Sequence, residues 1–208
     1  MKKSREIFFE YLDIIGFSAD SVRIMFEKYF HELVDINQKI NLFSRNTPID
    51  EIWTRFFLDS IGIFEVCRDW DGKNVLDFGS GGGFPGIPIK ILAPSCYMTL
   101  LDSTGKKIDA LMRISENIHL KEMSFLKHRI EGIEMVAYKN MYDIIVCRAV
   151  KITPDIVKSL KTLLCKDGKI FLYKSNNFDD VKLFTKYNVY KLDIEKFGNR
   201  NIIEINNG

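Results

Sequence analysis

The residues best suited to chemistry lie in a glycine-rich segment, VLDFGSGGGFPGIPIKIL, at positions 75–92. An apolar, strand-like run there reaches Asp77 and then meets Gly79, Gly81 and Gly83 before a helix-like run begins. Glycine accepts positive φ angles and lets a ligand approach the main chain closely. The segment therefore predicts a loop between a strand and a helix that holds a cofactor.

A carboxylate follows this loop at the spacing expected for ribose recognition. Asp102 ends the next strand-like run, YMTLLD, about 20 residues beyond Gly81. An acidic side chain at that place accepts hydrogen bonds from the two hydroxyl groups of a ribose. The loop and Asp102 together predict a cofactor that contains a nucleoside.

Two cofactor patterns can be fitted to the loop. The dinucleotide pattern G-x-G-x-x-G fails from Gly79 because residue 84 is Phe84, and from Gly81 it places Pro85 inside the turn. The pattern acid-x-G-x-G-x-G is met from Asp77 without strain. It resembles the first motif of the class I S-adenosylmethionine-dependent methyltransferases. A nicotinamide enzyme and a glycine turn without a ligand are the alternatives.

The elements that must position this loop alternate along the chain. After residue 71, short β-branched runs are separated by helical stretches such as KKIDALMRISENIHL; the runs are NVLDFG, YMTLLD, MSFLKH, YDIIVCRA and KIFLYK. This alternation predicts a parallel sheet with crossover helices. The last segment, VYKLDIEKFGNRNIIEI, instead predicts two strands about a turn at 197–199, which adds an antiparallel hairpin to the sheet edge.

The first third of the chain has helical periodicity. Apolar residues recur at three- and four-residue steps from Val22 to Ile40, which predicts one long amphipathic helix. A shorter helix is predicted from about residue 4 to Gly16, and another over about 50–67. We therefore expect an α/β fold in which a helical region at 1–68 packs as one unit with a Rossmann-like, mostly parallel methyltransferase sheet at 69–208.

Composition limits the classes of protein that fit. The chain has 208 residues, of which 46% are hydrophobic, so it suits one α/β domain and excludes a disordered or collagen-like protein. Its 30 basic and 28 acidic side chains leave a formal net charge of +2. A nucleic-acid partner must therefore be recognised by local clusters of charge.

The cysteines and the N-terminal segment favour a reduced, cytoplasmic protein. The four cysteines form no C-x-x-C pair and the three histidines are scattered, so we expect no metal; the cysteines are Cys67, Cys96, Cys147 and Cys165. They are expected to be reduced, buried thiols. Acidic residues interrupt the basic and apolar start MKKSREIFFEYLDII, and no apolar run is long enough to span a membrane.

Five segments taken together resemble one family. They are NLFS at 41–44, RFFLDS at 55–60, DFGSGGGFPGIPI at 77–89, LLDSTGKK at 100–107 and CRAV at 147–150. In this order they resemble the bacterial glucose-inhibited-division protein B family, the small-subunit ribosomal RNA guanine-N7 methyltransferases. The resemblance runs from about Gln38 to Arg200, and GFPGIP followed by LLDS-x-GK is far more specific than a glycine loop alone.

The resemblance implies methyl transfer from S-adenosyl-L-methionine to N7 of a guanine in 16S ribosomal RNA. With Asp102 added from the ribose argument, the expected cofactor-binding residues are Gly79, Gly81, Gly83, Phe84, Asp102, Ser103, Ile130, Glu131 and Arg148. Arg148 is expected to close the site and position the reactants. The family's basic residues near the RNA match Arg148, Lys174 and Arg200.

Three positions depart from the family's usual residues. Phe56 stands where His is common, Cys147 where Ser precedes the arginine, and Ser175 where Gly usually follows the lysine. A role of that histidine therefore does not carry over to this chain. The retained basic residues keep the main assignment.

Simpler roles compete for several of these residues. Arg148, at a strand end, also suits a structural ion pair. Lys174 and Arg200 also suit ordinary solvated surface charges. Asp59 and Ser60, in the predicted third helix, are expected to cap or pair locally.

The expected reaction needs no catalytic acid or base. N7 of guanine has a lone pair and no proton, so orientation and electrostatics must supply the rate. We expect a monomer that acts on a loop guanine of 16S ribosomal RNA or of the small ribosomal subunit. The alternatives are a methyltransferase for a protein or small molecule and a non-catalytic RNA- or ribosome-binding module; the sequence does not select the guanine.

Overall fold

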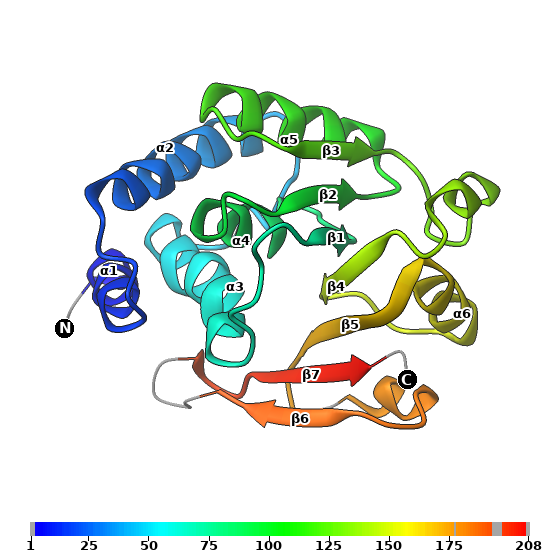
Figure 1. Ribbon diagram of the computed structural model, residues 1–208. Coiled ribbons are helices and arrows are strands. Elements are labelled where there is room, and N and C mark those ends of the chain that lie inside the picture. The colour runs from blue at the N-terminus through cyan, green and yellow to red at the C-terminus, as the bar shows by residue number, and fades with distance from the viewer. Residues whose placement is uncertain (1–2, 177, 193–196, 207–208) are drawn as a thin grey trace.

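The computed structural model describes residues 3–176, 178–192 and 197–206. Within these residues seven strands form one sheet in the order β3-β2-β1-β4-β5-β7-β6 (Figure 1). The strands are β1 (Asn74–Phe78), β2 (Tyr97–Leu101), β3 (Met123–Leu126), β4 (Tyr142–Arg148), β5 (Leu164–Lys174), β6 (Asn188–Lys191) and β7 (Asn201–Asn206). β1 to β5 are parallel, and β7 is antiparallel to both β5 and β6. The predicted sheet is confirmed.

Helices precede the sheet and connect its strands. The α-helices are α1 (Ser4–Ile14), α2 (Asp20–Asn37), α3 (Asp59–Ile61), α4 (Gly86–Leu92), α5 (Gly105–Asn117) and α6 (Pro154–Leu163). α1 is followed by Gly16 at a φ of +90°, which confirms the predicted glycine at the end of the first helix. No helix in the described part of the chain is long and apolar enough to cross a membrane.

The helix predicted over about 50–67 is irregular. It consists of a 3-10 turn η1 (Ile49–Glu51), a π-helical turn η2 (Trp53–Leu58), the short α3 and a second 3-10 turn η3 (Gly62–Glu65). Inside it the Ser60 hydroxyl donates to the carbonyl of Phe56, a type of bond that competes with the helix ladder. The predicted helix is thus confirmed in its position, but it is built of several types of helical turn.

Strand side chains point alternately into two apolar layers, as the two-residue period of a strand requires. The layer between the sheet and α1 to α5 takes Val75, Met98, Leu100, Ile144, Val146, Phe171, Tyr173 and Ile202. The layer under α6 and the 3-10 turns η4 (Ile133–Tyr138) and η5 (Asp179–Leu183) takes Leu76, Phe78, Leu101, Ile145, Cys147, Ile170, Leu172, Ile203 and Ile205. The N-terminal helices thus share an apolar layer with the sheet, while the domain boundary near residue 68 stays a prediction.

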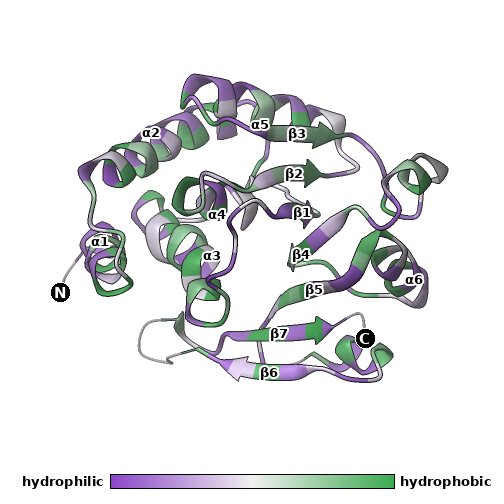
Figure 2. Cartoon of the chain, in the orientation of Figure 1, coloured by the Kyte–Doolittle hydropathy of each residue, from purple (hydrophilic) through white to green (hydrophobic). Residues whose placement is uncertain are grey.

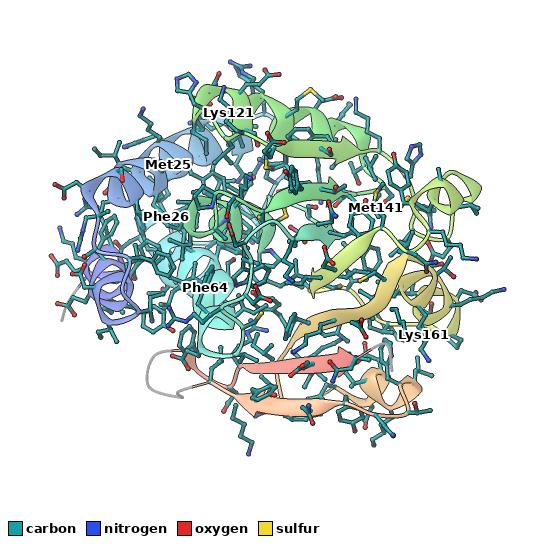
Figure 3. The ribbon with its side chains drawn as sticks, in the orientation of Figure 1. Met25, Phe26, Phe64, Lys121, Met141 and Lys161 are labelled. Atoms are coloured by element: carbon teal, nitrogen blue, oxygen red, sulfur yellow. The ribbon has the colours of Figure 1, made fainter. Side chains whose placement is uncertain are left out.

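The figures agree with this layering. Figure 2 shows both hydrophobic and hydrophilic residues along α2 and α5, as amphipathic helices require. Figure 3 shows Phe26 and Phe64 among the helices of the N-terminal part of the chain, where they are at most 2% exposed. The exposed Lys121 and Lys161 lie at the periphery.

The C-terminal strands form the predicted antiparallel hairpin, whose first strand is β6. This strand ends at Lys191, and the Leu192 amide donates to the Arg200 carbonyl at 3.1 Å. Gly198 has a φ of +61° in the predicted turn. The predicted strand positions 193–196 lie outside the described residues.

All four cysteines are free thiols. Cys96 and Cys147 are buried, whereas Cys67 and Cys165 are only half-buried. The expectation of reduced thiols stays a prediction, and the expectation that all of them are buried was wrong for Cys67 and Cys165. Both of these line a cavity with charged neighbours, and Cys67 also packs against the apolar layer that contains Val75.

Candidate cofactor and RNA site

A cavity of about 420 Å³ opens at the carboxyl ends of β1, β2 and β4, the edge at which open α/β sheets bind ligands. Its lining contains seven of the nine residues expected at the cofactor: Gly79, Gly81, Asp102, Ser103, Ile130, Glu131 and Arg148. The lining also includes Phe78, Leu101, Lys107, His128, Arg129, Ala149 and Val150. We call it the cofactor cavity.

The glycine loop has the backbone that the sequence predicted. Gly79, Gly81 and Gly83 have φ angles of +76°, +54° and +91°. A Cβ atom at Gly79 would lie 2.5 Å from Cγ2 of Val150, so this glycine is also required sterically. At Gly81 the nearest contact of such an atom is 3.8 Å away, so a side chain there would occupy cavity space.

Gly83 is not among the residues found to line the cofactor cavity, and it packs close to Tyr29 and Ile87. A Cβ atom on it would lie 2.8 Å from the hydroxyl of Tyr29, which belongs to α2. This hydroxyl donates a hydrogen bond of 2.8 Å to the carbonyl of Gly82, and the Tyr29 side chain is fully buried. Tyr29 thus anchors the glycine loop. The sequence showed Tyr29 only as part of an apolar stripe.

Phe84 is likewise not found in the lining of the cofactor cavity, although its ring lies 5.8 Å from the guanidinium of Arg148. It is 6% exposed and stacks on Phe56 with ring centroids 4.9 Å apart. Its contact with the cofactor stays a prediction. Phe84 packs against Phe56, and the guanidinium carbon of Arg148 lies 5.1 Å from the centroid of the Phe56 ring.

Asp102 connects the end of β2 to the glycine loop. Its Oδ2 accepts from the Gly81 amide at 3.0 Å, and its Oδ1 accepts from the Thr104 amide at 2.8 Å. Each carboxylate oxygen has a second lone pair for a ligand hydroxyl. The residue can therefore fix the loop and accept from a ribose at the same time.

Asp77, the acid of the glycine motif, is completely buried under the loop. Its Oδ2 accepts from the amide of Gly86 at 2.8 Å, at the first turn of α4. Burial raises the pKa of Asp77 to about 7, and the nearby carboxylate of Asp102 acts in the same direction. Asp77 holds the loop against α4 and is not found in the cavity lining.

Asp77→Asn is expected to remove a pH dependence of stability. Because the folded-state pKa lies near 7 and the ordinary value is 3.8, the folded state holds the proton over a range in which the unfolded state loses it. Asp77 therefore makes the wild type less stable as pH rises from about 4 to 7, by at most about 1.4 kcal/mol per pH unit. Urea unfolding of both proteins across this range is the measurement. Equal slopes in the two proteins would contradict the prediction.

Arg148 lies between the cofactor cavity and a second cavity. Its Nε binds Oδ2 of Asp59 at 2.7 Å, and its Nη2 donates to the carbonyl of Arg55 at 2.7 Å. Together with the stacking on Phe56, these contacts fix the guanidinium at three points. The ion pair considered for Arg148 exists, and it lies at the edge of the candidate site.

The second cavity, of about 420 Å³, is here named the outer cavity. It is lined by Thr47, Thr54, Arg55, Phe56, Asp59, Arg148, Phe197 and Arg200. Arg200 binds Oδ1 of Asp59 through its Nε, across 141 positions of sequence. The expectation that Asp59 caps or pairs locally was wrong, because the fold brings two distant arginines to it.

Lys174 is not brought to either cavity among the described residues. Its ammonium donates to Asp180 at 2.6 Å and to the carbonyl of Val150 at 3.2 Å, and the side chain is 12% exposed. The solvated charge considered for Lys174 was therefore wrong, and its contact with RNA is tested by the substitution below. The chain turns back after β5 and places Asp180 beside it.

Lys174→Ala is expected to lower stability by about 1 to 3 kcal/mol and to leave RNA binding unchanged. Burial alone would raise the pKa of Asp180, but the hydrogen bonds from Lys174 and the Ile152 amide hold it below its ordinary value. The stability difference between the two proteins should therefore be present above about pH 4 and be lost at lower pH. Urea unfolding measures it, and Lys182→Ala, which removes an exposed ion pair, is the control.

Several lining residues were not predicted from the sequence. Lys107, His128 and Arg129 border the cofactor cavity. Lys107 belongs to LLDSTGKK, so the motif itself was a usable signal. His128 and Arg129 follow β3 and gave no pattern, because only the sheet order, which places β3 beside β2, brings their loop to the cavity.

The sheet order and the cofactor cavity define the class I fold of S-adenosylmethionine-dependent methyltransferases. A solved S-adenosylmethionine-dependent methyltransferase from Aquifex aeolicus is similar in fold, with a TM-score of 0.62 at 12% sequence identity, over 86% of this chain and 98% of that one. The chain belongs to the GidB family, rRNA small subunit methyltransferase G, whose model matches residues 24–199. This confirms the predicted family.

Two relatives named ribosomal RNA small subunit methyltransferase G illustrate the match. The protein from Christiangramia forsetii is 35% identical over 174 residues, which cover 80% of this chain and 80% of the relative. The protein from Flavobacterium johnsoniae is 33% identical over 187 residues, which cover 79% of this chain and 87% of the relative. The similarity therefore extends over most of each protein.

Proposed function

We propose that this chain transfers a methyl group from S-adenosylmethionine to N7 of a guanine in 16S ribosomal RNA. Its family supports this activity. The observation that carries the proposal is the cofactor cavity, in which the Gly81 amide, the Asp102 carboxylate and Arg148 meet at the strand ends. The expected partner is the 16S RNA or the small ribosomal subunit, in the cytoplasm, with the protein as a monomer that needs no metal.

The residues present fit S-adenosylmethionine. Asp102 offers carboxylate lone pairs to a ribose diol, and Gly81 leaves open space over its backbone. Ile130 and Leu101 give the same cavity apolar surface for an adenine ring. When bound, S-adenosylmethionine supplies an electrophilic methyl group.

The chain's own residues need only orient the reactants. N7 of guanine carries no proton, so no side chain has to remove one. Cys147, beside Arg148, is buried, and burial raises the pKa of its thiol, so it stays protonated and does not act as a nucleophile. Methylation leaves positive charge on the purine, so Arg148 and Arg200 serve the reaction best by binding phosphates or O6 away from N7.

The test is methyl transfer with purified protein, tritiated S-adenosylmethionine and small subunits that lack the modification. We expect label in 16S RNA, and chemical strand cleavage at N7-methylguanine should identify one site. Naked 16S RNA, run in parallel, distinguishes free RNA from the assembled particle as substrate. Label in a protein or a small molecule would overturn the proposal in favour of another methyltransferase. Cofactor binding without turnover on either substrate would favour a non-catalytic RNA-binding module.

A further inference from the structure

Asp59 is a buried carboxylate at the edge of the site whose role the proposed reaction does not define. Its side chain is 7% exposed and binds the Nε atoms of two arginines, Arg148 and Arg200. A buried carboxylate needs a cation to offset its loss of hydration. One arginine would balance the charge, so the second leaves the cluster with an excess positive charge.

The two arginines keep donors available for a ligand. Nη2 of Arg148 is used on the Arg55 carbonyl, but among the described residues no partner is found for the terminal amino groups of Arg200. Both side chains line the outer cavity. A guanidinium whose Nε is held by a carboxylate presents its terminal amino groups in a fixed plane, and this fork matches phosphate oxygens.

The segment that carries Asp59 is held firmly against the sheet. The π-helical turn η2 ends directly before Asp59, and such turns are frequent at functional sites. The next residue, Ser60, donates to the Phe56 carbonyl and accepts at its own carbonyl from the hydroxyl of Tyr173 in β5, at 2.6 Å. The Asp59 carboxylate is therefore fixed relative to the strand ends that carry the cofactor cavity.

We propose that Asp59 is a positioning residue that holds Arg148 and Arg200 together so that they bind a phosphate group of the RNA in the outer cavity. Asp59 itself contacts neither RNA nor cofactor. Because Arg148 lines both cavities, the bound phosphate would lie beside the cofactor cavity and bring its nucleotide to the reaction. The inference rests on the proposed RNA substrate.

Asp59→Asn distinguishes a positioning role from a general effect of charge, because the two predict opposite changes in the affinity for RNA. Removal of a negative charge beside two arginines would tighten RNA binding if only net charge mattered. Loss of positioning should instead raise the KM for small subunits about tenfold, while kcat falls less. The matched control is Glu51→Gln. It removes the carboxylate that pairs with Arg55, a residue of the outer cavity, and leaves Asp59 in place. This control should bind RNA as well as the wild type or more tightly.

A double-mutant comparison shows whether Asp59 acts through Arg200. Asp59→Asn should raise the KM by a clearly smaller factor in an Arg200→Ala background than in the wild type. If Asp59→Asn does not fold, Arg200→Lys tests the same geometry, because it keeps the charge and loses the fork; it should resemble Arg200→Ala. The inference would be overturned by an unchanged or lower KM in folded Asp59→Asn. It would also be overturned if Asp59→Asn raised the KM by the same factor in both backgrounds, or if Arg200→Lys behaved like the wild type. Methylation by the wild-type protein tests the proposed function separately.

Discussion

Gly81→Val is expected to give a folded protein that no longer binds S-adenosylmethionine. Gly81 has a φ of +54°, and its amide donates to Asp102. A β-branched side chain disfavours this backbone conformation by about 1 to 2 kcal/mol and would also stand in the cofactor cavity. Since no protein atom lies closer than 3.8 Å to the added Cβ, the damage should fall mainly on the ligand. Calorimetry with S-adenosylmethionine is the measurement.

Gly72→Val is the matched control. Gly72 has a φ of +65°, and a Cβ atom there would meet nothing within 4 Å. The substitution therefore carries the same kind of backbone strain far from the cavity. We expect a similar loss of stability in both variants and loss of cofactor binding only in Gly81→Val. Near-normal cofactor affinity in folded Gly81→Val would contradict the assignment of this loop.

The parts of the site that depend on local backbone were predictable from the sequence. Gly79 and Gly81 mark positions where φ must be positive, and glycine is the residue that accepts such angles at the least cost. Asp102 follows from the same logic, because the end of a parallel strand faces the ligand edge of the sheet. These features need only the residue types and their order.

The parts that depend on tertiary contacts were not predictable. Tyr29 fits the apolar stripe of its helix, and nothing in that period shows that its hydroxyl reaches Gly82. Lys174 lies at the end of a strand, as predicted, but its ammonium forms an ion pair with Asp180. A pattern gives the face on which a side chain lies, whereas its partner is set by elements that are distant in sequence.

The irregular helix before β1 shows that backbone conformation, too, depends on tertiary contacts that the sequence pattern does not predict. Apolar spacing over 50–67 predicted a helix, and the segment is helical throughout its described core. The change from 3-10 to π and α turns follows from contacts that the spacing does not record. One of them is the bond from Tyr173 of β5 to the Ser60 carbonyl.

Arg148→Ala is expected to weaken both cofactor and RNA binding and to lower kcat/KM by about a hundredfold or more. The substitution removes the three contacts of the guanidinium, with Asp59, the Arg55 carbonyl and the Phe56 ring. Loss of one partner from a buried ion pair costs about 3 to 5 kcal/mol, and the cation–π contact adds about 0.5 to 2 kcal/mol. These figures are costs in folding stability. Both ligands are affected because Arg148 borders both cavities and its guanidinium would no longer be present to bind or orient either one.

Two control variants separate this effect from a general loss of stability. Arg68→Ala removes an exposed arginine, whose Nη1 donates to the Ile15 carbonyl at 2.9 Å outside both cavities. It should lower the urea midpoint and leave the affinity for both ligands unchanged. Arg148→Lys keeps the charge but cannot reach Asp59 and the Arg55 carbonyl with one planar group, so it should recover only part of the activity. Wild-type kcat/KM in folded Arg148→Ala would show that the arginine serves only as an ion-pair partner, because the reaction would then need no orientation from it.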